Sequence, residues 1–225
     1  MSTDSSTNPH PVTYFVTPQL TDRNRLTCFF RIILAIPHII LVGGPGFAIG
    51  FGGSLGGFDG NNSAWFIGGG ATGVIGAVAY VMAIISWFSI VFTGKHPKGL
   101  WDFASFFMHW RSRAIAYSGL LRDEYPPFGD GEYAVQLGLS EYPTTERNKL
   151  TVGLRLIYLI PHVIVLFFIG IAWAITAIIA WFVILFTGAY PEGLYRFAVG
   201  YMRWSLRVEA YALLMHDEYP PFSLD

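Results

Sequence analysis

Residues 121–128 read Leu-Arg-Asp-Glu-Tyr-Pro-Pro-Phe, and residues 215–222 read Met-His-Asp-Glu-Tyr-Pro-Pro-Phe. A shorter motif, Phe-Thr-Gly, occurs at 92–94 and again at 186–188, so both motifs recur at a spacing of 94 residues. Recurrence of several motifs at one spacing is the signature of an internal duplication. The chain therefore contains two copies of one unit.

The upstream parts of the two copies are spaced differently. Arg31 and His38 recur as Arg155 and His162, which are 124 residues further on. The first copy is therefore 30 residues longer, and its extra residues fall in a glycine-rich stretch at about 43–73. Because insertions are tolerated best in exposed loops, we expect this stretch to form one.

Composition places the chain among membrane proteins, since 53% of its residues are apolar and only 13% are charged. From Leu150 to Gly188 the only charged residue is Arg155, and the length suffices for two crossings of an apolar layer about 30 Å thick. We predict a tight transmembrane hairpin with its turn near Ile169–Trp173. One long helix is the alternative. The first copy offers residues 26–49 and 65–92 for the same two roles.

The distribution of basic residues predicts the orientation. The 14 Lys and Arg residues flank the expected spans on one side, apart from Arg31 and Arg155 just inside two helix starts. By the positive-inside rule, both termini face the cytoplasm, and the glycine-rich insertion faces outside. Because each copy then starts and ends on the same side, the repeat is parallel.

The expected fold is an all-α membrane protein. Its four transmembrane helices form two parallel-repeat hairpins, and a cytoplasmic interfacial amphipathic helix follows each hairpin, over Gly99–Tyr125 and Gly193–Tyr219. The predicted divisions are a disordered polar tail (1–22), repeat 1 (23–128), a cytoplasmic linker (129–146) and repeat 2 (147–225).

The first candidate site is formed by Arg31, His38, Arg155 and His162. In each pair the two residues are seven positions apart and so share one helix face. Polar side chains within a membrane helix either satisfy backbone groups on a neighbour or bind a ligand. Haem held between His38 and His162 is an alternative, although we expect no cofactor.

Two further sets of candidates lie in or after the expected interfacial helices. Arginines there are candidates for lipid headgroup contact: Arg111, Arg113, Arg203 and Arg207. Aromatic residues of the repeated motif are candidates for partner docking: Tyr125, Phe128, Tyr219 and Phe222. The alternative for the motif is a structural terminator, because its two prolines end a helix.

Several function classes are disfavoured. The predicted spans contain no carboxylate for a proton relay, Cys28 is the only cysteine, and the histidines outside the spans are scattered. We therefore expect no metal site and no enzyme. A net charge of −1 gives no reason to expect a nucleic-acid partner.

The run from Phe186 to Phe222 resembles the signature of a family of bacterial membrane proteins, domain of unknown function 4389, and residues 92–128 resemble it too. The shared pattern combines Thr-Gly, Pro-x-Gly, Arg-Trp and Tyr-Pro-Pro-Phe, and the resemblance covers most of residues 22–222. The first copy departs from it at His109-Trp110, where the second has Arg203-Trp204. The resemblance implies a membrane topology and no assigned activity.

Two function hypotheses follow. The first is a non-enzymatic accessory, scaffold or assembly subunit of a complex in the bacterial inner membrane, with membrane lipids and other membrane-protein subunits as partners. The second is a component that binds or transports a lipid or small ligand through the Arg/His pairs. A closed bundle with an exposed apolar helix face would favour the first, and an open groove near Arg155 and His162 the second.

Overall fold

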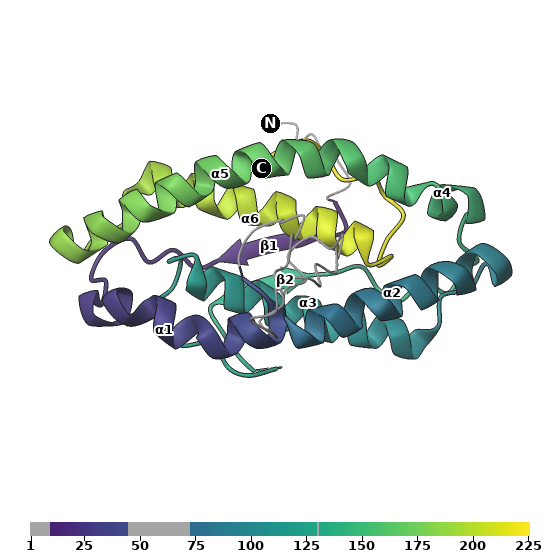
Figure 1. The fold of residues 1–225 in the computed structure, drawn as a ribbon, viewed down its shortest axis with the longest axis horizontal. Coiled ribbons are helices and arrows are strands. Elements are labelled where there is room, and N and C mark those ends of the chain that lie inside the picture. Colours follow the sequence, from purple (N-terminus) through teal and green to yellow (C-terminus); the bar gives the residue numbers. More distant parts are fainter. Residues whose placement is uncertain (1–9, 45–72, 130) are drawn as a thin grey trace, which may run out of the picture.

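The computed structural model describes residues 10–44, 73–129 and 131–225 (Figure 1). The described chain is mostly helical, as predicted, and also contains one two-stranded sheet. The glycine-rich insertion predicted at about 43–73 lies almost entirely outside the described residues. Residues 1–9 of the predicted tail lie outside them too.

The second copy consists of α4 (Lys149–Gly153), α5 (Arg155–Thr187) and α6 (Glu192–Ala212). Helix α5 has 33 residues, is about 50 Å long and runs without a break through Ile169–Trp173. The hairpin predicted there is wrong, because one continuous helix takes its place, and only 17% of the apolar window of this helix is buried. Gly170 serves close packing and not a turn, because a Cβ there would lie 2.8 Å from the Tyr201 hydroxyl of α6.

The first copy consists of α1 (Arg25–Val42), α2 (Val74–Thr93) and α3 (Lys98–Ser118). The end of α1 meets the start of α2, since a Cβ on Gly73 would lie 2.4 Å from the Gly43 nitrogen. At the repeat spacings, Val42 and Gly73 correspond to the consecutive residues Leu166 and Phe167 inside α5. Helices α1 and α2 are therefore the two halves of an α5-like helix, separated by the insertion.

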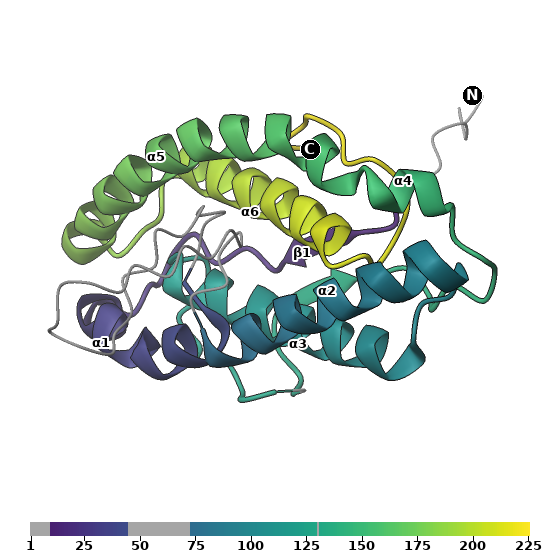
Figure 2. The same cartoon turned by 45° about the vertical axis from the view of Figure 1, so that its right-hand side comes forward.

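The helices of the two copies form two layers with the same arrangement. Figure 1 shows α5 along one side of the molecule and α1 followed by α2 along the other, and Figure 2 shows α6 and α3 between them. We call α1, α2 and α5 the outer helices, and α3 and α6 the inner helices. From Phe103 to Ser118 and from Phe197 to Ala212, no residue of an inner helix is exposed.

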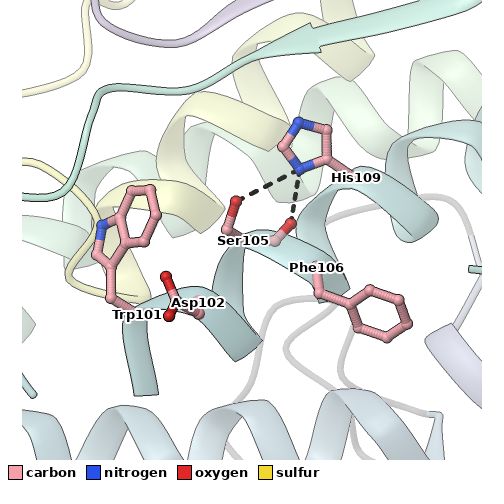
Figure 3. Close-up of a pocket in the computed structure, with 5 residues that line it drawn as sticks. All are labelled: Trp101, Asp102, Ser105, Phe106 and His109. Atoms are coloured by element: carbon pink, nitrogen blue, oxygen red, sulfur yellow. Dashed lines mark hydrogen bonds between the residues drawn. The ribbon is translucent and has the colours of Figure 1, made fainter. Parts of the chain in front are cut away.

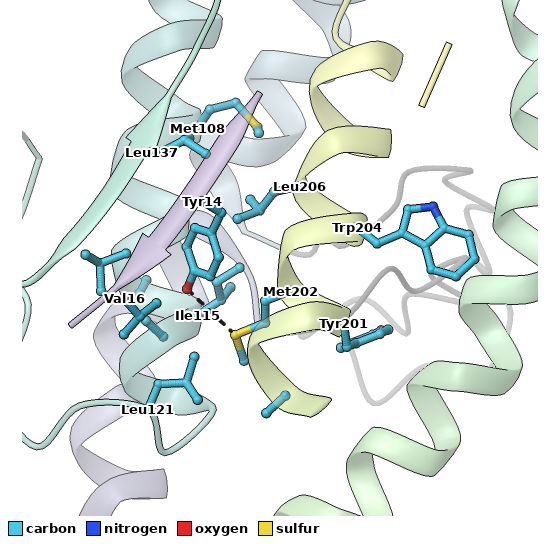
Figure 4. Close-up of a cluster of buried hydrophobic side chains, with 14 of the residues drawn as sticks. Tyr14, Val16, Met108, Ile115, Leu121, Leu137, Tyr201, Met202, Trp204 and Leu206 are labelled. Atoms are coloured by element: carbon cyan, nitrogen blue, oxygen red, sulfur yellow. Dashed lines mark hydrogen bonds between the residues drawn. The ribbon is translucent and has the colours of Figure 1, made fainter. Parts of the chain in front are cut away.

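The placement of the inner helices in the membrane interface stays a prediction, and within the protein both of their faces have protein neighbours. Their aromatic residues pack against the outer helices, as when Tyr201 stacks on Trp173 at 5.4 Å between ring centroids. Their other face packs against the strands, where the Tyr14 hydroxyl contacts the Met202 sulfur at 3.9 Å (Figure 4). The amphipathic pattern of these helices reflects two different protein neighbours.

The sheet joins the segments that precede the two copies. Strands β1 (Thr13–Val16) and β2 (Val135–Gly138) pair antiparallel, with Thr13 opposite Gly138 and Val16 opposite Val135. Each strand buries alternate residues, the pattern of a strand with one face on a core. The predicted disordered tail and linker thus each contain a strand, because each supplies the partner that the other lacks.

The two copies also hold each other through their backbones. The Arg23 N–H donates to the Gly188 carbonyl at the end of α5 at 3.0 Å, and the Arg147 N–H donates to the Gly94 carbonyl at the end of α2 at 2.8 Å. Both glycines have a positive φ and end their helices. Each copy therefore caps the long helix of the other.

Three described helices are long and apolar enough to span a membrane, namely α1, α2 and α5. Only 17% of the apolar window of α5 is buried within the protein, and 28% and 22% of those of α1 and α2. The outer helices thus present apolar faces to the surroundings.

Deleting residues 43–72 should fuse α1 and α2 into one helix equivalent to α5, because Val42 and Gly73 already meet. We expect the variant to fold, to retain its total helical ellipticity per molecule in far-UV circular dichroism, and to unfold cooperatively in detergent. Non-cooperative unfolding or a loss of helix would contradict the equivalence of α1 plus α2 with α5.

Candidate functional site

The repeated Asp-Glu-Tyr-Pro-Pro-Phe motif folds back onto the outer helix of its own copy. Leu120 and Leu214, at the ends of the inner helices, have φ values of 68° and 63°, and this left-handed turn reverses the chain. The motif then passes beside the Arg and His residues of α1 or α5. The sequence suggested the Arg/His pairs and the motif aromatics as separate candidates. The structure brings them together into one site in each copy.

The first part of each site is an arginine cluster. In the first copy, Asp123 accepts from Arg23 at 2.7 Å and from Arg31 at 2.5 Å. Arg31 also donates to the Tyr117 carbonyl at 2.9 Å, and its guanidinium lies 4.6 Å from the centre of the Tyr117 ring. Both guanidiniums are almost fully buried. One carboxylate thus neutralises two buried cations only in part.

The second copy repeats this cluster with Arg147, Arg155 and Asp217. Arg155 donates to Asp217 at 2.6 Å and to the Tyr211 carbonyl at 2.9 Å, and Arg147 binds the same carboxylate. The clusters differ in solvent access, because the Asp123 side chain is 9% exposed and that of Asp217 is 40% exposed.

Both aspartates are ionised by their arginines. Burial alone would raise the pKa of Asp123, but the hydrogen bonds and charges of Arg23 and Arg31 outweigh it and lower this pKa. The same balance lowers the pKa of Asp217. Sequence reasoning missed these carboxylates as partners of Arg31 and Arg155. Arg23 and Arg147 are 124 residues apart, as are Arg31 and Arg155, and this shared spacing was the signal that could have identified the arginine clusters.

The second part of each site is a histidine cage. The Trp110 indole N–H donates to His38 Nδ1 at 3.1 Å, and Phe128 stacks on the imidazole at 4.5 Å between centroids. In the second copy Trp204 donates to His162 Nδ1 at 3.2 Å, and Phe222 stacks at 4.0 Å. Because an indole N–H can only donate, Nδ1 must accept, which places the proton of a neutral ring on Nε2.

The motif aromatics are also partly exposed on their outer side. Tyr219 lies 4.8 Å from the His162 ring and remains 42% exposed, while Phe222 remains 52% exposed. Tyr125 and Phe128 behave in the same way around His38. These residues therefore close the cage and contribute to the outer surface at once.

The two histidines lie in separate cages. Each imidazole is stacked on a phenylalanine and its Nδ1 is bound to a tryptophan of its own copy, while its Nε2 is buried without a hydrogen-bond partner among the described residues. No group of three or more His, Cys, Asp or Glu residues in the described part of the chain is arranged to hold a metal.

The four candidate headgroup arginines bind protein atoms. Arg113 donates to the Gly129 carbonyl at 2.8 Å, Arg203 to the Tyr14 carbonyl at 3.3 Å, and Arg207 to the Val12 carbonyl at 3.4 Å. Arg111 is buried and forms an ion pair with Glu209 at 2.7 Å across the two copies. Burial raises the pKa of Glu209, and Arg111 opposes this rise only in part.

Arg111 has a further partner that explains its presence in the first copy alone. Its Nη1 donates to the Val42 carbonyl at the end of α1 at 2.6 Å. In the second copy the corresponding carbonyl, that of Leu166, lies inside the continuous helix α5, and Ser205 stands where Arg111 would be. The break in the long helix leaves carbonyls without helical donors, and Arg111 supplies one donor.

Two hollows of the described chain border α3, and the second of them also borders β2 and the residues before it. One of about 350 Å³ is lined by Trp101, Asp102, Ser105, Phe106 and His109 (Figure 3). His109 Nδ1 lies 2.8 Å from the Ser105 carbonyl, so this nitrogen carries the proton and cannot act as a base toward the Ser105 hydroxyl. The geometry offers no activated nucleophile.

Comparison with known proteins agrees with the duplication. A family model described as Domain of unknown function (DUF4389) matches residues 65–129 and 149–223, which contain α2 with α3 and α4 with α5 and α6. No curated protein and no solved structure matches the chain. The matched segments cover more than half of the chain, so the protein belongs to this family of unknown function and carries its domain twice.

Proposed function

We propose that this protein is an integral membrane protein that serves as a non-enzymatic accessory, scaffold or assembly subunit of a complex in the bacterial inner membrane. The observation that carries the proposal is the contrast between its two kinds of helix. The outer helices expose large apolar side chains along their length, while the inner helices are enclosed from Phe103 to Ser118 and from Phe197 to Ala212. Such apolar faces are unfavourable in water and match a lipid or protein surface.

The polar residues support a structural role. The arginine clusters and histidine cages bind the chain's own carboxylates, carbonyls and rings, which ties the repeated motif to the outer helices. Arg155 and His162 are 1% and 0% exposed, so the alternative of a lipid or ligand site at this pair gains no support. Exposed Tyr219 and Phe222 offer a surface for a membrane partner.

Membrane integration is tested by extraction of bacterial membranes that contain the protein. We expect it to stay with the membranes in alkaline carbonate and to dissolve only in detergent, because the outer faces need an apolar environment. Release by carbonate would contradict integration.

The accessory role is tested by native mass spectrometry of protein purified in mild detergent, with a visible spectrum of the same sample. We expect a stoichiometric protein partner that persists in the double variant His38→Ala/His162→Ala, once size-exclusion chromatography has shown that this variant is monodisperse. A retained lipid or a haem band that the double variant loses would instead establish the ligand-binding alternative.

A further inference from the structure

A pair of histidines outside the candidate spans joins the N-terminal segment to the second copy. His10 lies three residues before β1, and His216 lies in the second repeated motif. Their rings are 5.1 Å apart between centroids and nearly perpendicular, at 86°. His216 is only 6% exposed, while His10 is partly exposed, so the pair closes the protein around His216 from its outer side.

The groups around the pair are mainly positive. Arg207 of α6 and Glu218 of the motif face His10. His216 faces Arg155 of α5, Arg147 before α4, the Tyr211 ring of α6 at 5.9 Å and the backbone of Glu218. Burial lowers the pKa of His216 to about 3, helped by His10, Arg155 and Arg147. Burial also lowers the pKa of His10. The closed arrangement therefore requires neutral imidazoles.

The first copy provides an internal comparison. Arg122 occupies the position of His216 there, 94 residues earlier, and Tyr133 precedes β2 much as His10 precedes β1. The Tyr133 hydroxyl donates to the carbonyl of Glu124, the counterpart of Glu218, at 2.6 Å. Arginine and tyrosine keep their protonation states between pH 5 and 8, whereas histidine does not. Only the second copy has a titratable pair at this place.

The segment next to the pair is held on α6 by hydrogen bonds and by the buried side chains of Val12, Tyr14 and Val16. The carbonyls of Val12 and Tyr14 accept from Arg207 and Arg203, and the Tyr14 hydroxyl contacts the Met202 sulfur. Val12 is fully buried, and strand β1 has β2 as its strand partner. Loss of the contact between His10 and His216 therefore frees the start of this segment from the second copy.

We propose that His10 and His216 form an acid-sensitive latch that holds residues 10–16 against α6 at neutral pH and releases them as the imidazoles take up protons. Released imidazoles bind protons near their ordinary pKa of about 6.5, and latched ones bind them only at lower pH. The open state then binds more protons than the closed state below pH 6.5, so latch stability is complete above that pH and falls as pH drops.

The test is amide hydrogen exchange of residues 12–17 in the full chain in detergent, corrected for the intrinsic pH dependence of exchange. Between pH 7.5 and 5.5 we expect the protonation of His216 to lower the protection about tenfold, because pH 5.5 is about one unit below the pKa of a free imidazole. Protonation of His10 should lower the protection further. The double variant His10→Tyr/His216→Arg, which copies the Tyr133/Arg122 pair, should show no such fall.

The control segment is α1, where protection should not change over this pH range in either protein. If the copied pair disturbs folding, His10→Gln/His216→Gln replaces it and should also give a flat response. Unchanged protection of residues 12–17 in the natural protein would overturn the latch. An equal fall in the natural protein and a folded variant would overturn it too.

Discussion

Replacing Asp123 with alanine is expected to lower the free energy of unfolding by about 3–5 kcal/mol. The substitution leaves the buried guanidiniums of Arg23 and Arg31 without a counter-ion, and the desolvation of unpaired charge is costly. It also removes the acceptor for the Asn24 backbone N–H, at 2.8 Å, at the start of α1. Reversible unfolding in mixed detergent micelles, followed by circular dichroism, measures the loss.

Asp217→Ala is the matched control from the second copy. Its carboxylate also pairs with two arginines but is 40% exposed, so water can reach the space it vacates and solvate Arg147 and Arg155. We expect a clearly smaller loss than for Asp123→Ala. Equal losses would show that burial does not set the strength of these clusters.

Replacing Glu209 with alanine is expected to cost a similar amount, about 3–5 kcal/mol, because the buried charge of Arg111 then loses the carboxylate that neutralises it. The double variant Arg111→Met/Glu209→Leu removes both charges and keeps much of the volume. We expect it to recover most of the loss, because apolar replacement of a buried ion pair is often neutral. Thermal unfolding in detergent compares the variants.

Part of the remaining loss in the double variant comes from the Val42 carbonyl. It no longer has the donor that Arg111 supplies, which costs about 1–3 kcal/mol for a buried acceptor. Another part comes from the hydrogen bond between Glu209 and Tyr80, which the double variant also removes. In the background lacking residues 43–72, the Val42 carbonyl becomes part of a continuous helix, and the double variant should then lose less stability. A residual loss of the same size in both backgrounds would disprove the helix-end role of Arg111.

The sequence was sufficient for the duplication, the family and the apolar helices, because each rests on composition or on motifs at fixed spacings. It was insufficient for the path of the chain through residues 155–187. An apolar run of this length satisfies its backbone hydrogen bonds equally well as one long helix or as two short ones. Gly170 looked like part of a turn, but its role depends on Tyr201, which lies 31 residues away.

The sequence predicted which residues belong to the candidate site better than it predicted the contacts between them. His38 and His162 were identified by their recurrence seven residues after Arg31 and Arg155, and Tyr125, Phe128, Tyr219 and Phe222 by the repeated motif. That the two groups meet depends on the reversal at Leu120 and Leu214, where nonglycine residues adopt positive φ, and residue type did not indicate this. The role of Asp123 was missed for the same reason.

The reciprocal caps between the copies bear on how such a protein could arise. A chain with a single copy would have one strand without a partner, one long helix whose final glycine carbonyl lacks its donor, and one arginine N–H without its acceptor. A second identical chain, related by a two-fold axis through the strand pair, supplies all three at once. Gene fusion of such a homodimer would give the present arrangement, after which each half was free to diverge, as Arg111 and Ser205 have done.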